Sequence, residues 1–220
     1  MILRDLPVVA SWSGGKDSCL ALWRAVQAGA RPQALLTMLD ETGERSRSHG
    51  ARPEVLALQA DALGLPQRLG RASWNDYREV FVERLRAAAA DGARAVVFGD
   101  IDLAAHCEWE EGVCAEAGLE AILPLWQQAR ADLVREFVAA GFVARIVMVN
   151  AALADEKWLG RIVDARLIAE MLAEGVDPCG EAGEFHTLVV DGPLFARPLA
   201  LRDGAVAHLG DYRALDLLPA

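Results

Sequence analysis

Short apolar runs alternate with longer helix-forming segments through the first half of the chain. The apolar runs lie at 8–10, 34–38, 65–69, 95–98 and 119–123, and helices are predicted at 16–28, 53–63, 73–91 and 106–117. A glycine follows each of these helices, where it suits the C′ position. This alternation is typical of a parallel sheet with helices on both faces. The predicted fold class is therefore α/β, with a parallel, five-stranded, doubly wound sheet.

The pattern changes after Pro124-Leu125-Trp126. Beyond it we expect helices at 132–140 and 157–173, a strong strand at 143–149 and short strands at 187–190, 199–201 and 205–209. Because strands and helices no longer alternate regularly, this part is predicted to be a smaller α+β domain. The predicted domains are residues 1–128 and residues 129–220.

A glycine-rich turn, Ser11-Trp12-Ser13-Gly14-Gly15-Lys16-Asp17-Ser18, joins the first apolar run to the first predicted helix. Its two glycines let the backbone approach an anion closely and adopt positive φ angles. The N–H groups and the positive dipole at a helix N-terminus favour phosphate. Lys16 adds a positive charge, and the Asp17 carboxylate is a candidate Mg²⁺ ligand. The turn therefore predicts a phosphate site at the carboxyl end of the first strand.

The turn is not a Walker A loop, which has a glycine five residues before the Gly-Lys pair and Ser or Thr directly after it. Ala10 and Asp17 occupy those positions here. The stretch instead resembles the SGGxDS loop of the PP-loop ATP pyrophosphatases, which cleave ATP between the α- and β-phosphates. The alternative is an ordinary βα turn that uses glycine for geometry alone.

A second chemically rich segment, Gly180-Glu181-Ala182-Gly183-Glu184-Phe185-His186-Thr187, precedes a predicted strand of the second domain. Glycines bring the backbone near a ligand, and carboxylates can hold Mg²⁺, an ammonium ion or a proton in transit. On its own, this segment fits a solvated turn before a hairpin equally well.

Together, the two motifs resemble the diphthine–ammonia ligase family of ATP pyrophosphatases, whose C-terminal motif has the form GExGE[FY]xT. Further likeness lies in Phe98-Gly99-Asp100-Ile101, Pro124-Leu125-Trp126 and Trp158-Leu159-Gly160-Arg161, so the resemblance covers nearly the whole chain. It implies a HUP-like, adenine-nucleotide-binding first domain and a second domain that completes the active site. The founding members amidate diphthine, a modified histidine on an elongation factor of archaea and eukaryotes.

The resemblance implies a two-step ligation. A carboxylate attacks the α-phosphorus of ATP to give an acyl-adenylate and pyrophosphate, and ammonia then displaces AMP. The implied cofactors are ATP and Mg²⁺, and free ammonia is the implied nitrogen source because no obvious glutaminase module is present. The candidate catalytic residues are Lys16, Asp17, Glu181, Glu184 and His186, and Asp17 is the candidate metal ligand.

The candidate nucleotide-binding residues lie in the turn and at the ends of later strands. They are Ser11, Ser13, Gly14, Gly15, Lys16, Asp17, Ser18, Thr37, His49, Gly99 and Asp100. His49 fits a nucleotide pocket and a simple helix entrance equally well.

Net charge and the lengths of the apolar runs limit the binding partners and the location that we expect. The net charge is −10, with 32 acidic against 22 basic residues, which argues against nucleic-acid binding because such binding depends on Lys and Arg at phosphates. We find no signal-peptide pattern and no apolar run of membrane-spanning length, so we expect a cytoplasmic protein with no membrane partner. The carboxylate acceptor is a small molecule or a modified protein histidine, and a homodimer is one possible assembly.

Two other functions stay open. A tRNA-thiolating PP-loop enzyme would use cysteines, and Cys179 stands beside the second motif, but the acidic charge and the lack of a CxxC pair count against this function. A nucleotide-binding sensor without turnover would leave the second motif unexplained.

One further helix carries ionisable groups. His106 and Glu110 are four residues apart, but the HExxH order of zinc enzymes is absent. We interpret them as parts of a surface or partly buried helix, and Cys107 and Cys114 as core residues of the same helix.

Overall fold

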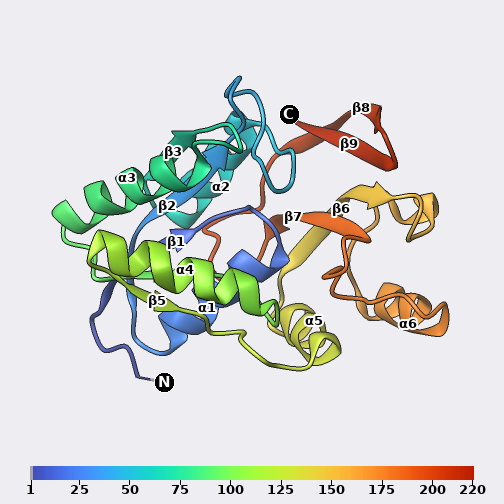
Figure 1. Ribbon diagram of the computed structural model, residues 1–220. Coiled ribbons are helices and arrows are strands. Elements are labelled where there is room, and N and C mark those ends of the chain that lie inside the picture. The colour runs from blue at the N-terminus through green and yellow to red at the C-terminus, as the bar shows by residue number, and fades with distance from the viewer. Residues whose placement is uncertain (1) are drawn as a thin grey trace. The chain divides into compact units, whose positions relative to one another are not determined.

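The computed structural model describes residues 2–220 (Figure 1). They divide into two compact units: unit 1 contains residues 2–13, 17–48 and 64–127, and unit 2 contains residues 14–16, 49–63 and 128–220. The domain boundary at residue 128 stays a prediction. The two units differ from the predicted domains in that Gly14–Lys16 and His49–Leu63 group with the C-terminal part of the chain.

Unit 1 is built on an all-parallel sheet with the strand order β3-β2-β1-β4-β5. The strands are β1 (Pro7–Ser11), β2 (Arg31–Leu39), β3 (Gln67–Arg71), β4 (Ala95–Val97) and β5 (Glu120–Ile122). The order reverses between β1 and β4, and ligands of such sheets bind at the carboxyl ends of strands at this switch point. The predicted α/β class with a parallel, five-stranded sheet is confirmed.

The helices that complete unit 1 are α1 (Lys16–Gln27), α3 (Tyr77–Ala90) and α4 (Ala104–Ala117). Helices α3 and α4 pack against each other, and their apolar faces bury Val9, Leu36 and Val96 of the sheet. Strand side chains alternate between faces, so Val8 and Ala10, which are also buried, point the other way. Because βαβ crossovers are right-handed, α1 covers that opposite face.

Unit 2 contains a four-stranded antiparallel sheet with the order β7-β6-β9-β8. The strands are β6 (Val143–Asn150), β7 (Phe185–Asp191), β8 (Leu201–Leu209) and β9 (Tyr212–Pro219). The helices are α2 (Pro53–Leu63), α5 (Arg130–Ala139), α6 (Ala165–Ala173) and the 3₁₀ helix η1 (Glu156–Trp158). Helix α2 packs against β9, where Val55, Val147, Leu188 and Leu217 form an apolar cluster.

The helix predicted at 157–173 is wrong in its first half. Only η1 forms there, and α6 begins at Ala165, where the carboxylate of Asp164 accepts a hydrogen bond from the backbone N–H of Leu167 at 2.7 Å. Between them, Gly160 has a φ of 80° and Ile162 forms an antiparallel bridge with Arg145. The intervening segment is therefore tied to the sheet instead of continuing the helix.

Other boundaries also differ from the sequence prediction. The two strands predicted at 199–201 and 205–209 are one strand, β8, and its partner β9 was not predicted. Helix α3 begins at Tyr77 because residues 73–76 form a turn, in which the carboxylate of Asp76 accepts hydrogen bonds from the N–H and the hydroxyl of Ser73.

Candidate active site

The glycine turn is fixed by hydrogen bonds within unit 2. The carbonyl oxygen of Gly14 accepts from the side-chain amide of Gln59 and from the backbone N–H of Val189, each at 2.9 Å. The Gln59 amide also donates to the Val189 carbonyl at 2.8 Å. Gly14 has a φ of 81°, and a Cβ there would lie 2.7 Å from the Gln59 side chain. Only glycine therefore fits this position without strain.

The second motif binds the same turn. The hydroxyl of Thr187 accepts a hydrogen bond from the backbone N–H of Lys16 at 3.1 Å. This N–H begins α1 and was expected to be available to phosphate, so the structure corrects that expectation for one donor. The Lys16 side chain is buried, and its ammonium lies 5.9 Å from the centre of the Phe185 ring.

His49 packs on the turn just before α2. Its Nδ1 lies 2.8 Å from the carbonyl oxygen of Thr187, and a Cβ at Gly15 would come within 2.2 Å of its ring. A carbonyl only accepts hydrogen bonds, so Nδ1 carries the proton. Burial lowers the pKa of His49 to about 4, and the charge of Lys16 acts in the same direction, while the bond to Thr187 opposes them. The imidazole is therefore neutral at pH 7.

The carboxylates of the second motif have different surroundings. Glu184 is 7% exposed and accepts a hydrogen bond from the backbone N–H of Ala182 at 2.9 Å, whereas Glu181 lies in the turn before β7. His186 follows on β7, with its ring centre 4.8 Å from that of His49 and 6.3 Å from that of Tyr212. A buried carboxylate argues against a purely solvated turn.

The remaining candidates lie in unit 1. The hydroxyls of Ser13 and Ser18 are 3.1 Å apart, and Asp17 lies in the first turn of α1. Ser11 ends β1, and the hydroxyl of Thr37, on β2, donates to the Trp12 carbonyl at 2.7 Å, which fixes the chain after β1.

Gly99 follows β4 and lies against the N-terminus of α1. A Cβ on Gly99 would lie 2.7 Å from the backbone nitrogen of Ser18 and 2.8 Å from the carbonyl carbon of Asp17. A residue without a side chain is therefore required at position 99 for the chain after β4 to contact the backbone at the N-terminus of α1. The glycine turn and the buried ammonium of Lys16 fit the phosphates of a nucleoside triphosphate. The carboxylate of Asp17 offers hard oxygen ligands, which fit Mg²⁺.

Asp100, Glu110 and His106 form a further cluster in unit 1. The Nδ1 of the exposed His106 lies 2.6 Å from Oδ1 of Asp100. Glu110 is 4% exposed, and burial raises its pKa to about 11, with the hydrogen bond and the charge of Asp100 adding to the shift. Helix α4 is therefore exposed at His106 and buried at Glu110, as expected for a partly buried helix. Cys114 is a core residue as predicted, but Cys107 is only partly buried.

Gln59 and Thr187 were not predicted as residues that hold the turn. Gln59 is fully buried, and its neighbours Val55, Leu56 and Ala60 on α2 are buried apolar residues. A polar side chain on an apolar helix face is the one sequence signal that points to Gln59. Thr187 was part of the second motif, but no local pattern predicts its bond to a residue 171 positions away.

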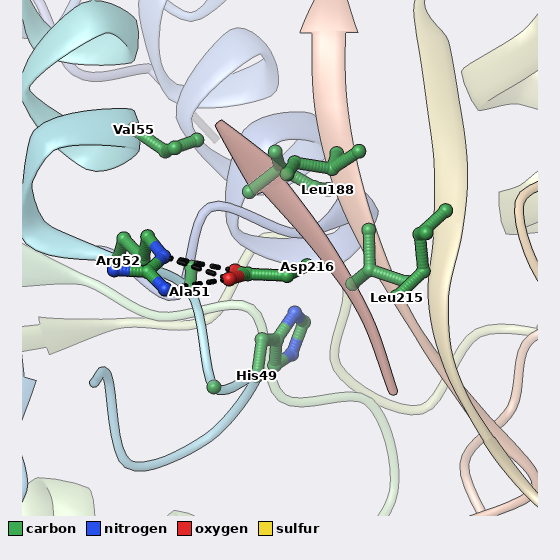
Figure 2. Close-up of a pocket in the computed structure, with 10 residues that line it drawn as sticks. His49, Ala51, Arg52, Val55, Leu188, Leu215 and Asp216 are labelled. Carbon is green, nitrogen blue, oxygen red and sulfur yellow. Dashed lines mark hydrogen bonds and ion pairs between the residues drawn. The ribbon is translucent and has the colours of Figure 1, made fainter. Parts of the chain in front are cut away.

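Unit 2 also contains a small pocket that opens to solvent (Figure 2). Its walls are mostly apolar, and its polar residues are His49, Arg52 and Asp216. The guanidinium of Arg52 binds the Asp216 carboxylate through Nε and Nη2 at 2.6–3.0 Å. Because this pair neutralises itself, the cavity offers no uncompensated Arg52 charge to a phosphate.

The parallel sheet, the glycine turn after β1 and the close approach of Gly99 to α1 together define an α/β protein of the mononucleotide-binding class. Residues 6–121 match the diphthamide synthase N-terminal domain, and residues 129–211 match the diphthamide synthase C-terminal domain. The chain belongs to the diphthamide synthase family. The resemblance predicted from its two motifs is confirmed.

Curated relatives are similar over most of the chain. The diphthine–ammonia ligase of Schizosaccharomyces pombe is 29% identical over 230 residues, which are 92% of this chain and 37% of that protein. The human diphthine–ammonia ligase is 29% identical over 234 residues, which are 93% of this chain and 86% of that protein. The chain thus spans about a third of the yeast relative and most of the human one.

A solved structure, described as a predicted subunit of tRNA methyltransferase from Methanocaldococcus jannaschii, is 17% identical, with a TM-score of 0.47 over 86% of this chain and 98% of that chain. Within residues 2–220, no helix has both the length and the apolar character that crossing a membrane requires.

Proposed function

We propose that this chain is an ATP-dependent ligase that activates a carboxylate as an acyl-adenylate, releases pyrophosphate and lets ammonia displace AMP. The coarser activity, an ammonia ligase, is the one for which its relatives are named. One observation carries the proposal: the second motif is bound to the glycine turn through Thr187 and Lys16. An acceptor site at the second motif would then adjoin the phosphate-binding turn. Family membership favours this function over tRNA thiolation and over a non-catalytic sensor.

In this proposal the glycine turn serves the adenylation step, and the second motif serves the reaction with ammonia. Carboxylate oxygen is a poor leaving group, and adenylation replaces it with AMP, a good one. The buried ammonium of Lys16 and the glycine turn stabilise the charge of the departing pyrophosphate. Asp17 would hold Mg²⁺, which spreads that charge. Glu181, Glu184 and His186 serve the ammonia and the acceptor.

The acceptor is a carboxylate, and diphthine is the first candidate because the relatives are named for it. The same proposal places the protein in the cytoplasm. Sedimentation measurements on the purified protein would decide whether it is a homodimer.

The test is product analysis with Mg·ATP, an ammonium salt and a diphthine-bearing elongation factor. AMP and pyrophosphate are the expected products, and label in the γ-phosphate should leave in pyrophosphate. Asp17→Asn is the control for contaminating phosphatases, and it should form no AMP while keeping its circular dichroism spectrum. ADP as the main product of the pure protein, or normal AMP formation by Asp17→Asn, would overturn the proposal.

A further inference from the structure

A tyrosine outside both sequence motifs, Tyr212, lies beside the second motif in unit 2. It begins β9 and pairs with Asn150 of β6. On the other side of β6, Met148 pairs with His186 of β7. Paired residues of neighbouring strands point to the same face of a sheet, and so do residues two apart on one strand. The side chains of His186 and Tyr212 therefore share one face of the antiparallel sheet.

This face is accessible to a ligand. The four residues of the two pairs that hold His186 and Tyr212 are all half-buried. The adjacent pair, Val149 with Phe185, points to the opposite face, and neither residue is more than 2% exposed. The rings of His186 and Tyr212 are stacked at an interplanar angle of 22°. A half-buried aromatic surface therefore extends from the second motif onto β9.

The hydroxyl of Tyr212 lies close to Gly183, in the middle of the second motif. Gly183 has a φ of 88°, and a Cβ there would lie 3.7 Å from the hydroxyl oxygen. Glu181 and Glu184 stand on either side of this glycine. Within residues 2–220, the Tyr212 hydroxyl makes no hydrogen bond, and it is not sealed from solvent. It is therefore available to a ligand that lies over Gly183.

Charge decides which chemical group this hydroxyl suits. In the proposed function, the acceptor brings a carboxylate to a motif that already holds Glu181 and Glu184. A Lys or Arg side chain in the place of Tyr212 would pair with those two carboxylates, whereas a phenol donates one hydrogen bond and adds no charge. Hydrogen bonds to ionised oxygen are stronger than those between neutral groups. The hydroxyl therefore suits a carboxylate oxygen of the acceptor.

We propose that Tyr212 is an acceptor-binding residue, whose hydroxyl donates a hydrogen bond to the acceptor carboxylate over Gly183. Its ring, stacked with that of His186, forms one wall of the acceptor site. This inference rests on the proposed function. A carboxylate has two oxygens, so one is held by Tyr212 while the other attacks the α-phosphorus of ATP. No bond forms or breaks at Tyr212 itself.

Removal of the hydroxyl alone is the first test. The assay follows AMP formation with Mg·ATP, ammonium chloride and the diphthine-bearing elongation factor. We expect Tyr212→Phe to raise the KM for the elongation factor about 10-fold, the effect of losing one hydrogen bond to a charged group. The affinity for Mg·ATP, measured by calorimetry, and the melting temperature should stay at their wild-type values, because the ring and its packing are kept.

Tyr77→Phe is the matched control. It removes the hydroxyl of the chain's other tyrosine, which lies on α3 in unit 1. The KM for the elongation factor and the affinity for Mg·ATP should both be unchanged in this variant.

The two tyrosines also allow a binding test that does not depend on turnover. With fluorotyrosine in place of tyrosine, the protein gives two fluorine NMR signals, which the two Phe variants assign. In the presence of Mg²⁺ and a non-hydrolysable ATP analogue, the diphthine-bearing elongation factor should shift the Tyr212 signal and leave the Tyr77 signal in place. The elongation factor with an unmodified histidine, which lacks the carboxylate, should not shift either signal.

The outcomes separate this inference from the proposed function. A wild-type KM in folded Tyr212→Phe, or a Tyr212 signal that responds equally to both forms of the elongation factor, overturns the assignment and leaves the ligase proposal intact. Equal losses of affinity for Mg·ATP and for the elongation factor also overturn it, because they indicate a general disturbance of unit 2. If the wild-type protein releases no pyrophosphate with this acceptor, the ligase proposal fails, and this inference fails with it.

Discussion

The hydroxyl of Thr187 caps the backbone N–H of Lys16, 171 residues earlier in the chain, at 3.1 Å. Both groups are buried, so neither can turn to water if the other is removed. One hydrogen bond thus sets the first residue of α1 against the strand that carries the second motif.

Replacing Thr187 with valine keeps the shape of the side chain but removes the acceptor. The uncapped Lys16 N–H should cost about 1–3 kcal/mol in the free energy of unfolding, and AMP formation should fall because the turn loses its anchor. Thr187→Ser, which keeps the hydroxyl, should lie close to the wild type in both measurements. Denaturant unfolding and AMP release would check this, and equal behaviour of the two variants would contradict the role of the hydroxyl.

Substitution of Gly15 should act first through His49. A Cβ there would come within 2.2 Å of the imidazole ring, so Gly15→Ala should displace the ring, and Gly15→Val should also break its bond to Thr187. We expect ATP binding and AMP formation to fall in both, more in the valine variant, with the overall secondary structure retained. Calorimetric ATP titration beside circular dichroism measures this. Normal ATP affinity in a folded Gly15→Val protein would show that the turn is not the nucleotide site.

Glu184→Gln should separate binding from turnover. The buried carboxylate is neutralised without loss of volume, and the proposed role lies with the acceptor and not with ATP. Mg·ATP should therefore bind within about three-fold of the wild-type affinity, while AMP release falls by one to two orders of magnitude, a loss confined to the transition state. His186→Ala should cost less. Unchanged turnover in folded Glu184→Gln would return the second motif to a structural turn.

His49 should make the protein less stable in mild acid. Its pKa is about 4 in the folded protein, against an ordinary value of 6.5, so the unfolded chain takes up the proton first. The free energy of unfolding is therefore at its full value above about pH 6.5, and it falls as the pH is lowered from there to about 4. The loss amounts to about 3 kcal/mol, at about 1.4 kcal/mol per pKa unit. His49→Asn, which can still donate to the Thr187 carbonyl, should flatten this part of a stability–pH curve, and an unchanged slope would contradict the assignment.

Much of unit 1 could be predicted because the sequence patterns that specify its strands and helices are local. Each apolar run and glycine-terminated helix is visible within a few residues, and Pro53 marks the first residue of α2. The end of η1 and the start of α6 were missed because Trp158 and Ile162 continue an apolar pattern that fits a helix, whereas the pairing of Ile162 with Arg145 is a tertiary contact. Periodicity alone cannot register such a contact.

The site was predicted by residue type more than by geometry. The two motifs identified the relevant segments, but not that Thr187 and Gln59 bind the glycine turn, nor that Asp100 pairs with His106. Each of these depends on side chains that the fold brings together. The buried state of Glu110 was equally hidden, since acidic residues on a helix are usually solvated.

The hydrogen bonds around Gly14 have a consequence for how the protein is made. The turn lies in residues 11–18, but its partners Thr187 and Val189 are synthesised at least 171 residues after the turn residues that they bind. Pairings of such long sequence separation form late, because the intervening loop must close first. A nascent or truncated chain that stops before β7 therefore carries the complete SGGKDS sequence without the means to shape it. We therefore expect such a chain to bind a nucleotide only after β7 has been synthesised.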